Sequence, residues 1–185
     1  MLIVIGVIVV VLIILILSWV ITTYNALVVL RNKVKNQWSQ IDVLLKRRCD
    51  LIPNLVETVK GYAKHEESTL TSVIEARNKY VTASTDSEKM EASGEITGAL
   101  SRLFALSEAY PELKANPNFA ELQNELTETE DKIAYARQFY NDSVMQYQNK
   151  LVTFPSNTIA SMFGFKSEKY FEIAEADKEA PKVKF

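Results

Sequence analysis

The sequence predicts an all-α protein, with an N-terminal transmembrane helix followed by an antiparallel, up-and-down bundle of long helices. Three observations predict it. Residues 2–21 form a nearly unbroken apolar run, the apolar residues after it recur at steps of three and four, and alternating strand-like runs are nearly absent. Glycine and proline number only five each among 185 residues, which suits long helices and excludes a low-complexity linker.

The N-terminal run is long enough to cross a bilayer. Every residue in 2–21 except Ser18 is apolar, and none is charged. A helix of this length spans about 30 Å, the thickness of the hydrocarbon core. Trp19 and Tyr24 fall where interfacial aromatic side chains gather. We therefore expect residues 1–23 to be a transmembrane anchor.

A cleaved secretory signal is the competing interpretation of this run. Such a signal has a basic segment before a shorter apolar core and ends at a cleavage site of small residues. Here no charged side chain precedes the run, the run is longer, and residues 18–21 offer no cleavage site. These features favour a retained anchor.

The charges that follow the run predict its orientation. Residues 22–48 contain one acidic side chain, Asp42, and six basic ones. The basic residues are Arg31, Lys33, Lys35, Lys46, Arg47 and Arg48. Cytoplasmic flanks of membrane helices carry an excess of Lys and Arg, so the N-terminus is expected outside and the body in the cytoplasm.

The body, residues 24–154, begins with a helix that continues from the anchor. Its apolar stripe runs from Leu27 to Val73, and no turn signal separates it from the anchor. Pro53 removes one backbone donor and crowds the carbonyl four residues earlier, which predicts a kink there. The polar stretch after Gly61 is a second place for a break. Both positions stay open.

Later helix boundaries are clearer. Thr85 and Glu88 match a capping box, so a helix is expected to begin there and to run to Tyr110, where Pro111 ends it.

The last long helix is expected to span residues 117–152. Asn116 suits the N-cap and Pro117 the first helical position. Short connections make successive helices antiparallel neighbours, and an even number of them would return residue 152 toward the membrane.

The C-terminal part, residues 155–185, contains a short predicted helix at 156–165 with an apolar edge of Ile159, Met162 and Phe163. Packing on the end of the bundle is favoured over lying in the membrane interface. The tail from residue 169 alternates aromatic and charged residues, and it is expected to be loosely ordered or to pair with something.

Charge is unevenly distributed along the body. Residues 31–48 are basic and residues 108–131 are acidic, although the net charge is only −2. Two solvated helix faces are the favoured interpretation, and head-to-tail contact between copies is the alternative. The near-neutral total gives no field that would indicate nucleic-acid binding.

Catalytic and metal-binding patterns are missing. His65 is the only histidine, and the zinc-protease pattern that it begins has Thr69 where the second histidine belongs. Cys49 is the only cysteine, so no disulfide forms within one chain. The acids read as outward-facing helix positions. We therefore expect no enzyme, no cofactor and no metal.

Arg137 is the one unusual charge, because it falls where the last helix steps between apolar residues. A charge in a core needs a partner or a route to water. We hypothesise a buried or half-buried pair that fixes helix register. The candidate partners are Asp50, Asn54, Glu57 and Glu130.

Long stretches of the chain resemble the LemA family of bacterial membrane proteins. They include Tyr24–Val28, Trp38–Val43, Asp50–Ala63, Glu108–Asn116 and Phe154–Asn157, and the resemblance covers essentially the whole chain. One departure is Gln148–Asn149. The resemblance implies a single membrane helix in the bacterial inner membrane with its amino end outside, a cytoplasmic four-helix bundle, no enzymatic activity and no cofactor.

Two functions follow from these observations. The favoured hypothesis is a scaffold that self-associates into a homo-oligomer and organises or shapes the lipid bilayer. Copies would meet near the membrane through Tyr24, Leu27, Arg31 and Trp38. The alternative is an adaptor or regulator of another membrane protein, such as a membrane protease or a sensor kinase. Family members are often encoded beside a membrane zinc protease, which motivates the alternative.

Overall fold

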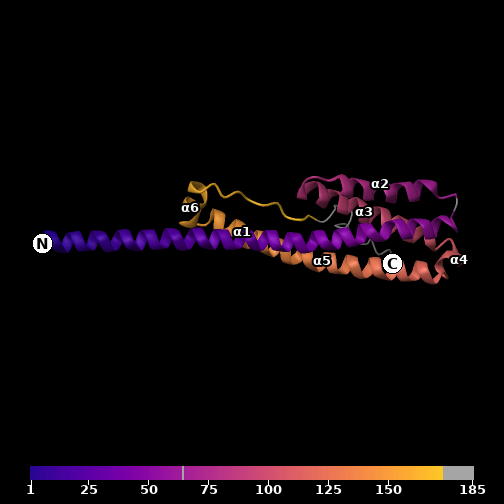
Figure 1. Cartoon of the computed structure of the whole chain (residues 1–185), viewed down its shortest axis with the longest axis horizontal. Coiled ribbons are helices and arrows are strands. Elements are labelled where there is room, and N and C mark those ends of the chain that lie inside the picture. The colour runs from indigo at the N-terminus through magenta and orange to yellow at the C-terminus, as the bar shows by residue number, and fades with distance from the viewer. Residues whose placement is uncertain (64, 173–185) are drawn as a thin grey trace, which may run out of the picture. The chain divides into compact units, whose positions relative to one another are not determined.

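The computed structural model describes residues 1–63 and 65–172, and within them it contains helices and no strands. The predicted all-α class is confirmed (Figure 1). The helices are α1 (Leu2–Lys60), α2 (Glu67–Thr82), α3 (Asp86–Ser107), α4 (Pro111–Lys114), α5 (Pro117–Val152) and α6 (Ser156–Met162).

The chain forms two compact units, and α1 and α5 contribute to both. Unit 1 contains Met1–Ser39 and Gln138–Tyr170. Unit 2 contains Gln40–Arg137 and Phe171–Phe185, of which the last thirteen residues (173–185) lie outside the described part. The predicted boundaries after residues 23 and 154 both fall inside unit 1, and as limits of the anchor and the bundle they stay predictions.

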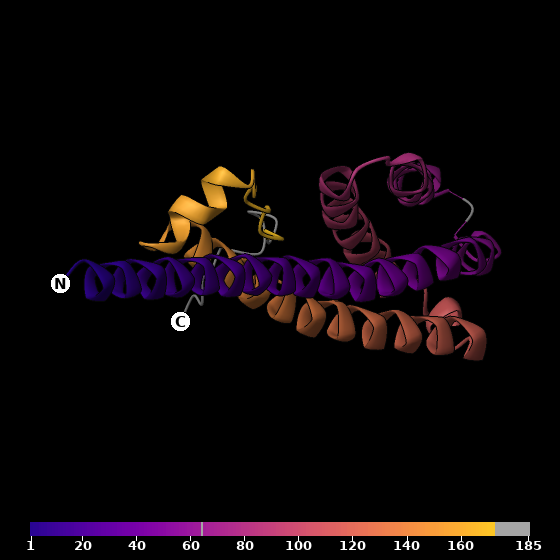
Figure 2. The same cartoon turned by 60° about the vertical axis from the view of Figure 1, so that its left-hand side comes forward.

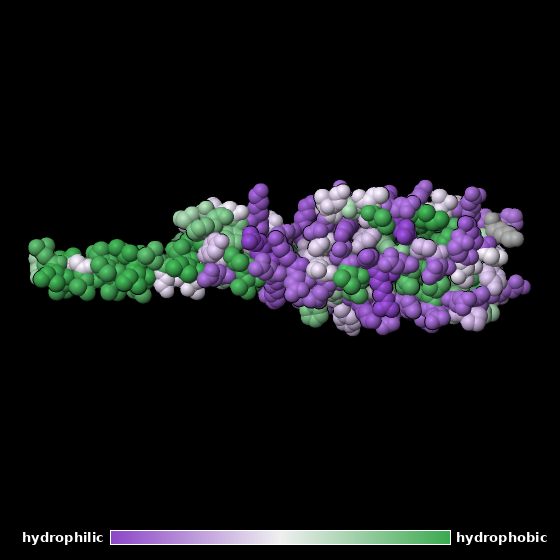
Figure 3. Space-filling model, viewed as in Figure 1, coloured by the Kyte–Doolittle hydropathy of each residue, from purple (hydrophilic) through white to green (hydrophobic). Residues whose placement is uncertain are grey.

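The N-terminal stretch of α1 in unit 1 is apolar, and the described part of the chain buries none of its apolar window. By length and composition α1 can cross a membrane, and the apolar window within it is wholly exposed. Hydrophobic residues cover this stretch in Figure 3. Water is a poor solvent for such a surface.

The other end of unit 1 is packed, because α5 returns beside α1. Leu27 and Val34 of α1 are buried, as are Val144 and Tyr147 of α5. The ammonium of Lys33 donates to the amide oxygen of Gln146 at 3.0 Å. Helix α6 then lies beside α1 (Figure 2) and buries Ile159 and Ala160.

Unit 2 is a helical bundle built from the second part of α1, helices α2, α3 and α4, and the first part of α5. Helices α2 and α3 lie side by side, joined by a short turn (Figures 1 and 2). The largest apolar side chains of the core are fully buried: Ile41, Leu45, Ile52, Leu55, Ile96, Leu103, Leu113 and Phe119.

Helix α1 continues through Pro53 and ends at Lys60. Of the two break positions left open, the chain turns at the second, directly before Gly61. Proline at 53 cannot donate to the carbonyl of Cys49, but Arg77 of α2 does so from Nε at 3.0 Å. Because this donor replaces the missing backbone bond, the helix passes its proline without ending.

The start of α3 is as predicted, but its end is not. Thr85 and Glu88 form the capping box, with Oγ1 of Thr85 accepting from the Glu88 amide at 3.2 Å. The helix ends at Ser107 instead of Tyr110, because the next three amides bond three residues back and tighten the turn. Pro111 then opens α4 instead of only ending a helix.

Helix α5 has the predicted limits. The side-chain oxygen of Asn116 accepts from the amide of Phe119 at 3.1 Å, as an N-cap does, and the helix ends at Val152.

The described part of the tail is packed. Phe171 is buried in unit 2. In unit 1, the hydroxyl of Tyr140 donates to the carbonyl of Lys169 at 2.9 Å, and the amide of Gln148 donates to the carbonyl of Glu168 at 2.7 Å. Of the two alternatives for the tail, these contacts fit pairing with the rest of the chain up to Phe171, and residues 173–185 lie outside the described part.

Candidate functional site

A buried charge network in unit 2 centres on Arg48. This arginine of α1 is fully buried. Its Nη1 donates to the carboxylate of Glu130 at 2.5 Å and to Oγ1 of Thr97 at 3.0 Å. Its Nη2 donates to the hydroxyl and the carbonyl of Ser93, at 2.7 and 3.0 Å.

The network joins three helices. Arg48 belongs to α1, Ser93 and Thr97 belong to α3, and Glu130 belongs to α5. A guanidinium carries its donors in a rigid planar fork, so these four bonds form together only when the helices keep one register. A buried charge without such partners would strongly destabilise the fold. The network is thus a structural centre of unit 2.

A second polar cluster lies at Asp42 in the same unit. Its carboxylate accepts from the hydroxyl of Tyr80 at 2.9 Å and from the ammonium of Lys89 at 2.7 Å. Burial, and then the bond to Asp42, raise the pKa of the Tyr80 hydroxyl. A tyrosine kept protonated in this way serves as a hydrogen-bond donor between helices.

Cys49 should resist thiol reagents in the folded protein. Burial, only partly opposed by Arg48 and Arg77, raises the pKa of its thiol to about 11. At pH 8 we expect labelling by a disulfide reagent to be at least about a hundredfold slower than in the unfolded chain. The rate with and without denaturant measures this difference.

The same shift predicts how stability depends on alkaline pH. The pKa of the thiol is higher in the folded than in the unfolded state, so its contribution is complete below pH 9 and is lost as the pH rises toward 11. In the labelling experiment at pH 8, a fast reaction of Cys49 in the native protein would mean that α1 opens near Pro53.

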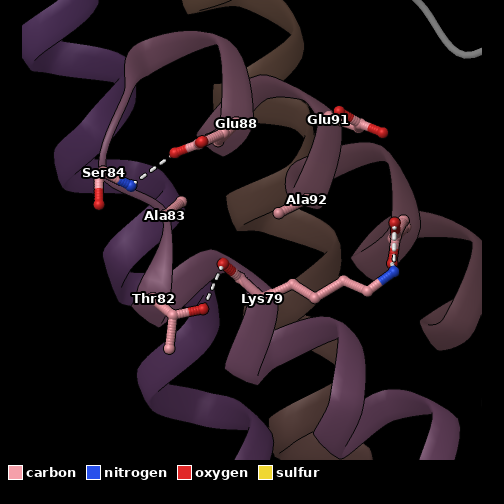
Figure 4. A pocket seen from close by; sticks show the side chains of 8 residues that line it. Lys79, Thr82, Ala83, Ser84, Glu88, Glu91 and Ala92 are labelled. Carbon is pink, nitrogen blue, oxygen red and sulfur yellow. Dashed lines mark hydrogen bonds and ion pairs between the residues drawn. The ribbon is translucent and has the colours of Figure 1, made fainter.

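A shallow cavity lies between α2 and α3. It has a volume of about 390 Å³ and is lined by Lys79, Glu88, Glu91 and Glu95, among others (Figure 4). Lys79 forms an ion pair with Glu95 at 2.7 Å, and Glu88 caps α3 through the amides of Ser84 and Thr85. These side chains offer an acidic surface, but they form no arrangement of nucleophile and base.

Metal chemistry finds no support in the described part of the chain. Within residues 1–63 and 65–172 no group of three His, Cys, Asp or Glu side chains is placed to hold an ion. His65 is exposed in the turn between α1 and α2. The absence of a cofactor stays a prediction.

Three of the four predicted partners of Arg137 are exposed or bind another residue. Glu130 binds Arg48, Glu57 binds Lys60 at the surface at 3.3 Å, and Asp50 is exposed. Asp50 and Glu57 are therefore exposed and not buried. The guanidinium of Arg137 lies 4.5 Å from the centre of the Phe171 ring. A pair that fixes helix register through Arg137 stays a prediction.

Arg48 is the buried charge that sequence reasoning missed. The apolar stripe of α1 steps from Leu45 to Ile52, and a step of seven needs an inward residue at 48 or 49. The argument that singled out Arg137 therefore applies equally to Arg48. Because Arg48 ends a basic segment, the sequence around it resembles a solvated face.

The basic and acidic segments meet within one chain in unit 2. Arg48 binds Glu130, and Arg47 lies 3.8 Å from Glu125. The interpretation as two solvated faces is therefore wrong at Arg48, which is buried, whereas the side chains of Arg47 and Glu125 stay partly exposed to solvent.

The four residues predicted to lie between copies all have contacts within unit 1. Leu27 is fully buried. Tyr24 meets the rings of Phe163 and Phe165 at centroid distances of 4.9 and 5.6 Å. Arg31 also lies over Phe165, at 5.3 Å.

Trp38 packs against Tyr140, with ring centroids 5.8 Å apart. Because Leu27 is fully buried within its own chain, it has no surface left for a second copy. Whether Tyr24, Arg31 or Trp38 meets a second copy stays a prediction.

The family model of the LemA family matches residues 37–185, which include both polar clusters, the whole of unit 2 and half of unit 1. The chain belongs to the LemA family. Together with the exposed apolar stretch of α1, membership in the LemA family indicates a membrane-associated protein.

Curated relatives of this LemA-family chain agree with the match. Magnetosome protein MamQ 1 of Paramagnetospirillum magneticum is 27% identical over 175 residues, covering 80% of this chain and 64% of the relative. Magnetosome protein MamQ of Magnetospirillum gryphiswaldense is 28% identical over 174 residues with the same coverage. Protein LemA of Metamycoplasma hominis is 25% identical over 149 residues, covering 80% and 68%. The chain thus spans about 64% of the length of the MamQ relatives.

Proposed function

We propose that the protein is a non-enzymatic, membrane-anchored scaffold that associates with copies of itself and organises or shapes the bilayer. The observation that carries the proposal is α1, in which an exposed apolar stretch and the first helix of the body form one continuous helix. A rigid helix through the membrane surface would give every copy the same orientation.

Shared orientation favours association, because anchoring raises the effective concentration of the copies and removes most of their rotational freedom. Side-by-side contacts between identical copies close into rings or extend into sheets. Such an array would impose its own curvature on the membrane. The charge after the anchor supports an outside N-terminus and a cytoplasmic body in the bacterial inner membrane.

Large apolar side chains on the body of unit 1 supply a surface for such contacts. Val29 of α1 and Phe139 of α5 are exposed and lie beyond the apolar stretch. Burying an exposed phenylalanine between two copies would contribute about 1.5–3 kcal/mol.

Phe139→Glu is therefore expected to reduce the assembled fraction of the full-length protein in mild detergent at least about tenfold. The phenylalanine is 59% exposed in one chain, so the change should leave the fold intact. Light scattering and electron microscopy measure mass and shape.

Val81→Glu is the matched control, since Val81 is also 59% exposed but lies on α2 in unit 2. It should leave the assembly unchanged. A wild-type protein that is uniformly monomeric or dimeric would rule out the scaffold.

The second candidate is an adaptor for another membrane protein, such as a protease or sensor kinase. The acidic cavity between α2 and α3 favours it, because a basic side chain of a partner would fit beside Glu91. A photo-crosslinker at Glu91 in native membranes would then trap one partner in a fixed ratio. A crosslinker at Val81, on the outside of α2, should trap much less.

A further inference from the structure

Helix α6 and the turn before it carry apolar side chains on their outer face. Phe154 is 80% exposed and Met162 69% exposed, and Val152 and Phe163 are exposed as well. The inner face is already used, because Ile159 and Ala160 are buried within the chain. The outer face therefore presents apolar surface that packing in unit 1 does not need. We call residues 152–163 the foot.

The foot lies beside the end of the apolar stretch of α1. The ring of Phe163 is 4.9 Å from that of Tyr24, and Tyr24 follows the last residue of the apolar run, Ile21, by three positions. Three residues of helix correspond to about 4.5 Å along the axis. If the run crosses the hydrocarbon core, the foot stands at the level of the lipid headgroups.

The net charge of unit 1 suits an anionic membrane surface. Its two segments contain six basic and two acidic side chains, a difference of four positive charges. The basic residues are Arg31, Lys33, Lys35, Lys150, Lys166 and Lys169, and the acidic residues are Asp142 and Glu168. Each basic residue close to an anionic leaflet contributes about 1 kcal/mol of attraction.

We infer that the foot lies in the headgroup region of an anionic bilayer, with Phe154, Met162 and Phe163 turned toward the acyl chains. Exposed aromatic and apolar side chains beside basic ones are typical of segments that lie in the interface. The bilayer is favoured over a second copy or another protein because the covalent anchor already holds the foot at that depth. The protein would thus be held in the membrane at two points, the transmembrane helix and the foot.

Contact with the membrane at two points restricts the motion of α1. A single helix can tilt and rotate in a bilayer, whereas a second contact beside it fixes its rotation. The inference rests on the membrane anchor of the proposed function, and it does not depend on self-association.

The test compares two methionines of unit 1 in the full-length protein. Met162 belongs to the foot, and Met145 is exposed on α5 two turns before its end. Each is replaced by cysteine in a Cys49→Ala background and labelled with an environment-sensitive fluorophore. The proteins are reconstituted into vesicles of phosphatidylethanolamine and phosphatidylglycerol that contain lipids with a quencher near the headgroup.

The label at residue 162 is expected to be quenched by these lipids at least about twofold more strongly than the label at 145. Phe154→Cys should behave like Met162→Cys, which guards against a local effect of either substitution. Iodide in the water should quench in the opposite order.

Equal lipid quenching at residues 162 and 145 would overturn the inference. So would a label at 162 that is shielded from iodide without being quenched by lipid, because a second copy or another protein would then cover the foot. Light scattering on the same samples reports self-association separately, so a monomer with an embedded foot would reject the scaffold and keep this inference.

Discussion

Replacing Arg48 with alanine is expected to lower the free energy of unfolding by about 3 kcal/mol. The substitution removes four hydrogen bonds and leaves the carboxylate of Glu130 and the hydroxyl of Ser93 without their charged donor. We expect the lower end of the range for a broken buried pair, because the side chain of Glu130 is 36% exposed and water can reach it. Urea unfolding followed by circular dichroism measures the loss.

Arg47→Ala is the matched control. Its side chain is half-exposed and lies 3.8 Å from Glu125, so the loss should not exceed about 0.5 kcal/mol. The two neighbouring arginines differ in burial and partners but remove the same charge. Equal effects of the two substitutions would mean that net charge, and not the buried network, sets the stability.

A double substitution separates stability from specificity. Arg48→Met with Glu130→Leu removes both charges and fills the space with apolar groups, and such replacements are often neutral or stabilising. We expect the double variant to recover most of the stability that Arg48→Ala loses. If it also unfolds over a broader transition, the network serves to fix the register of α1, α3 and α5.

Local rules predicted the helices where one chemical group decides the outcome. The cap at Thr85 and the start of α5 after Asn116 were predicted correctly, because each depends on residues within one turn. Pro53 was not decided by local sequence. The donor that lets α1 continue comes from Arg77, on another helix.

The parts of the candidate site that depend on contacts between distant segments could not be predicted from the sequence. The rings of Tyr24 and Phe163 meet only because α5 returns along α1, and no spacing in the sequence encodes that pairing. Arg48 is a different case. The sequence alone places Arg48 on the apolar stripe of α1. A segment with several basic residues, however, resembles a solvated face until the burial of each side chain is known.

Deleting residues 2–18 is expected to release the protein from the membrane without unfolding its body. These residues are exposed throughout, so their removal takes away no packing within the chain. Leu, Ile and Val each favour insertion by about 0.3–0.6 kcal/mol, which over the run amounts to more than a thousandfold in partition. After an alkaline carbonate wash, the intact protein should stay in the membrane pellet and the deletion variant in the supernatant.

Two further measurements decide what the anchor does. The intact mass of the membrane-extracted protein should include residues 2–18, whereas a mature chain without them would establish a cleaved signal.

Replacing the run with an unrelated apolar helix of equal length should restore membrane retention. If it also restores the assembly, the run acts only as an anchor, and contacts between copies belong to the body. If retention returns and assembly does not, the membrane helices themselves pack between copies, and the search for the interface moves from Phe139 to the apolar stretch of α1.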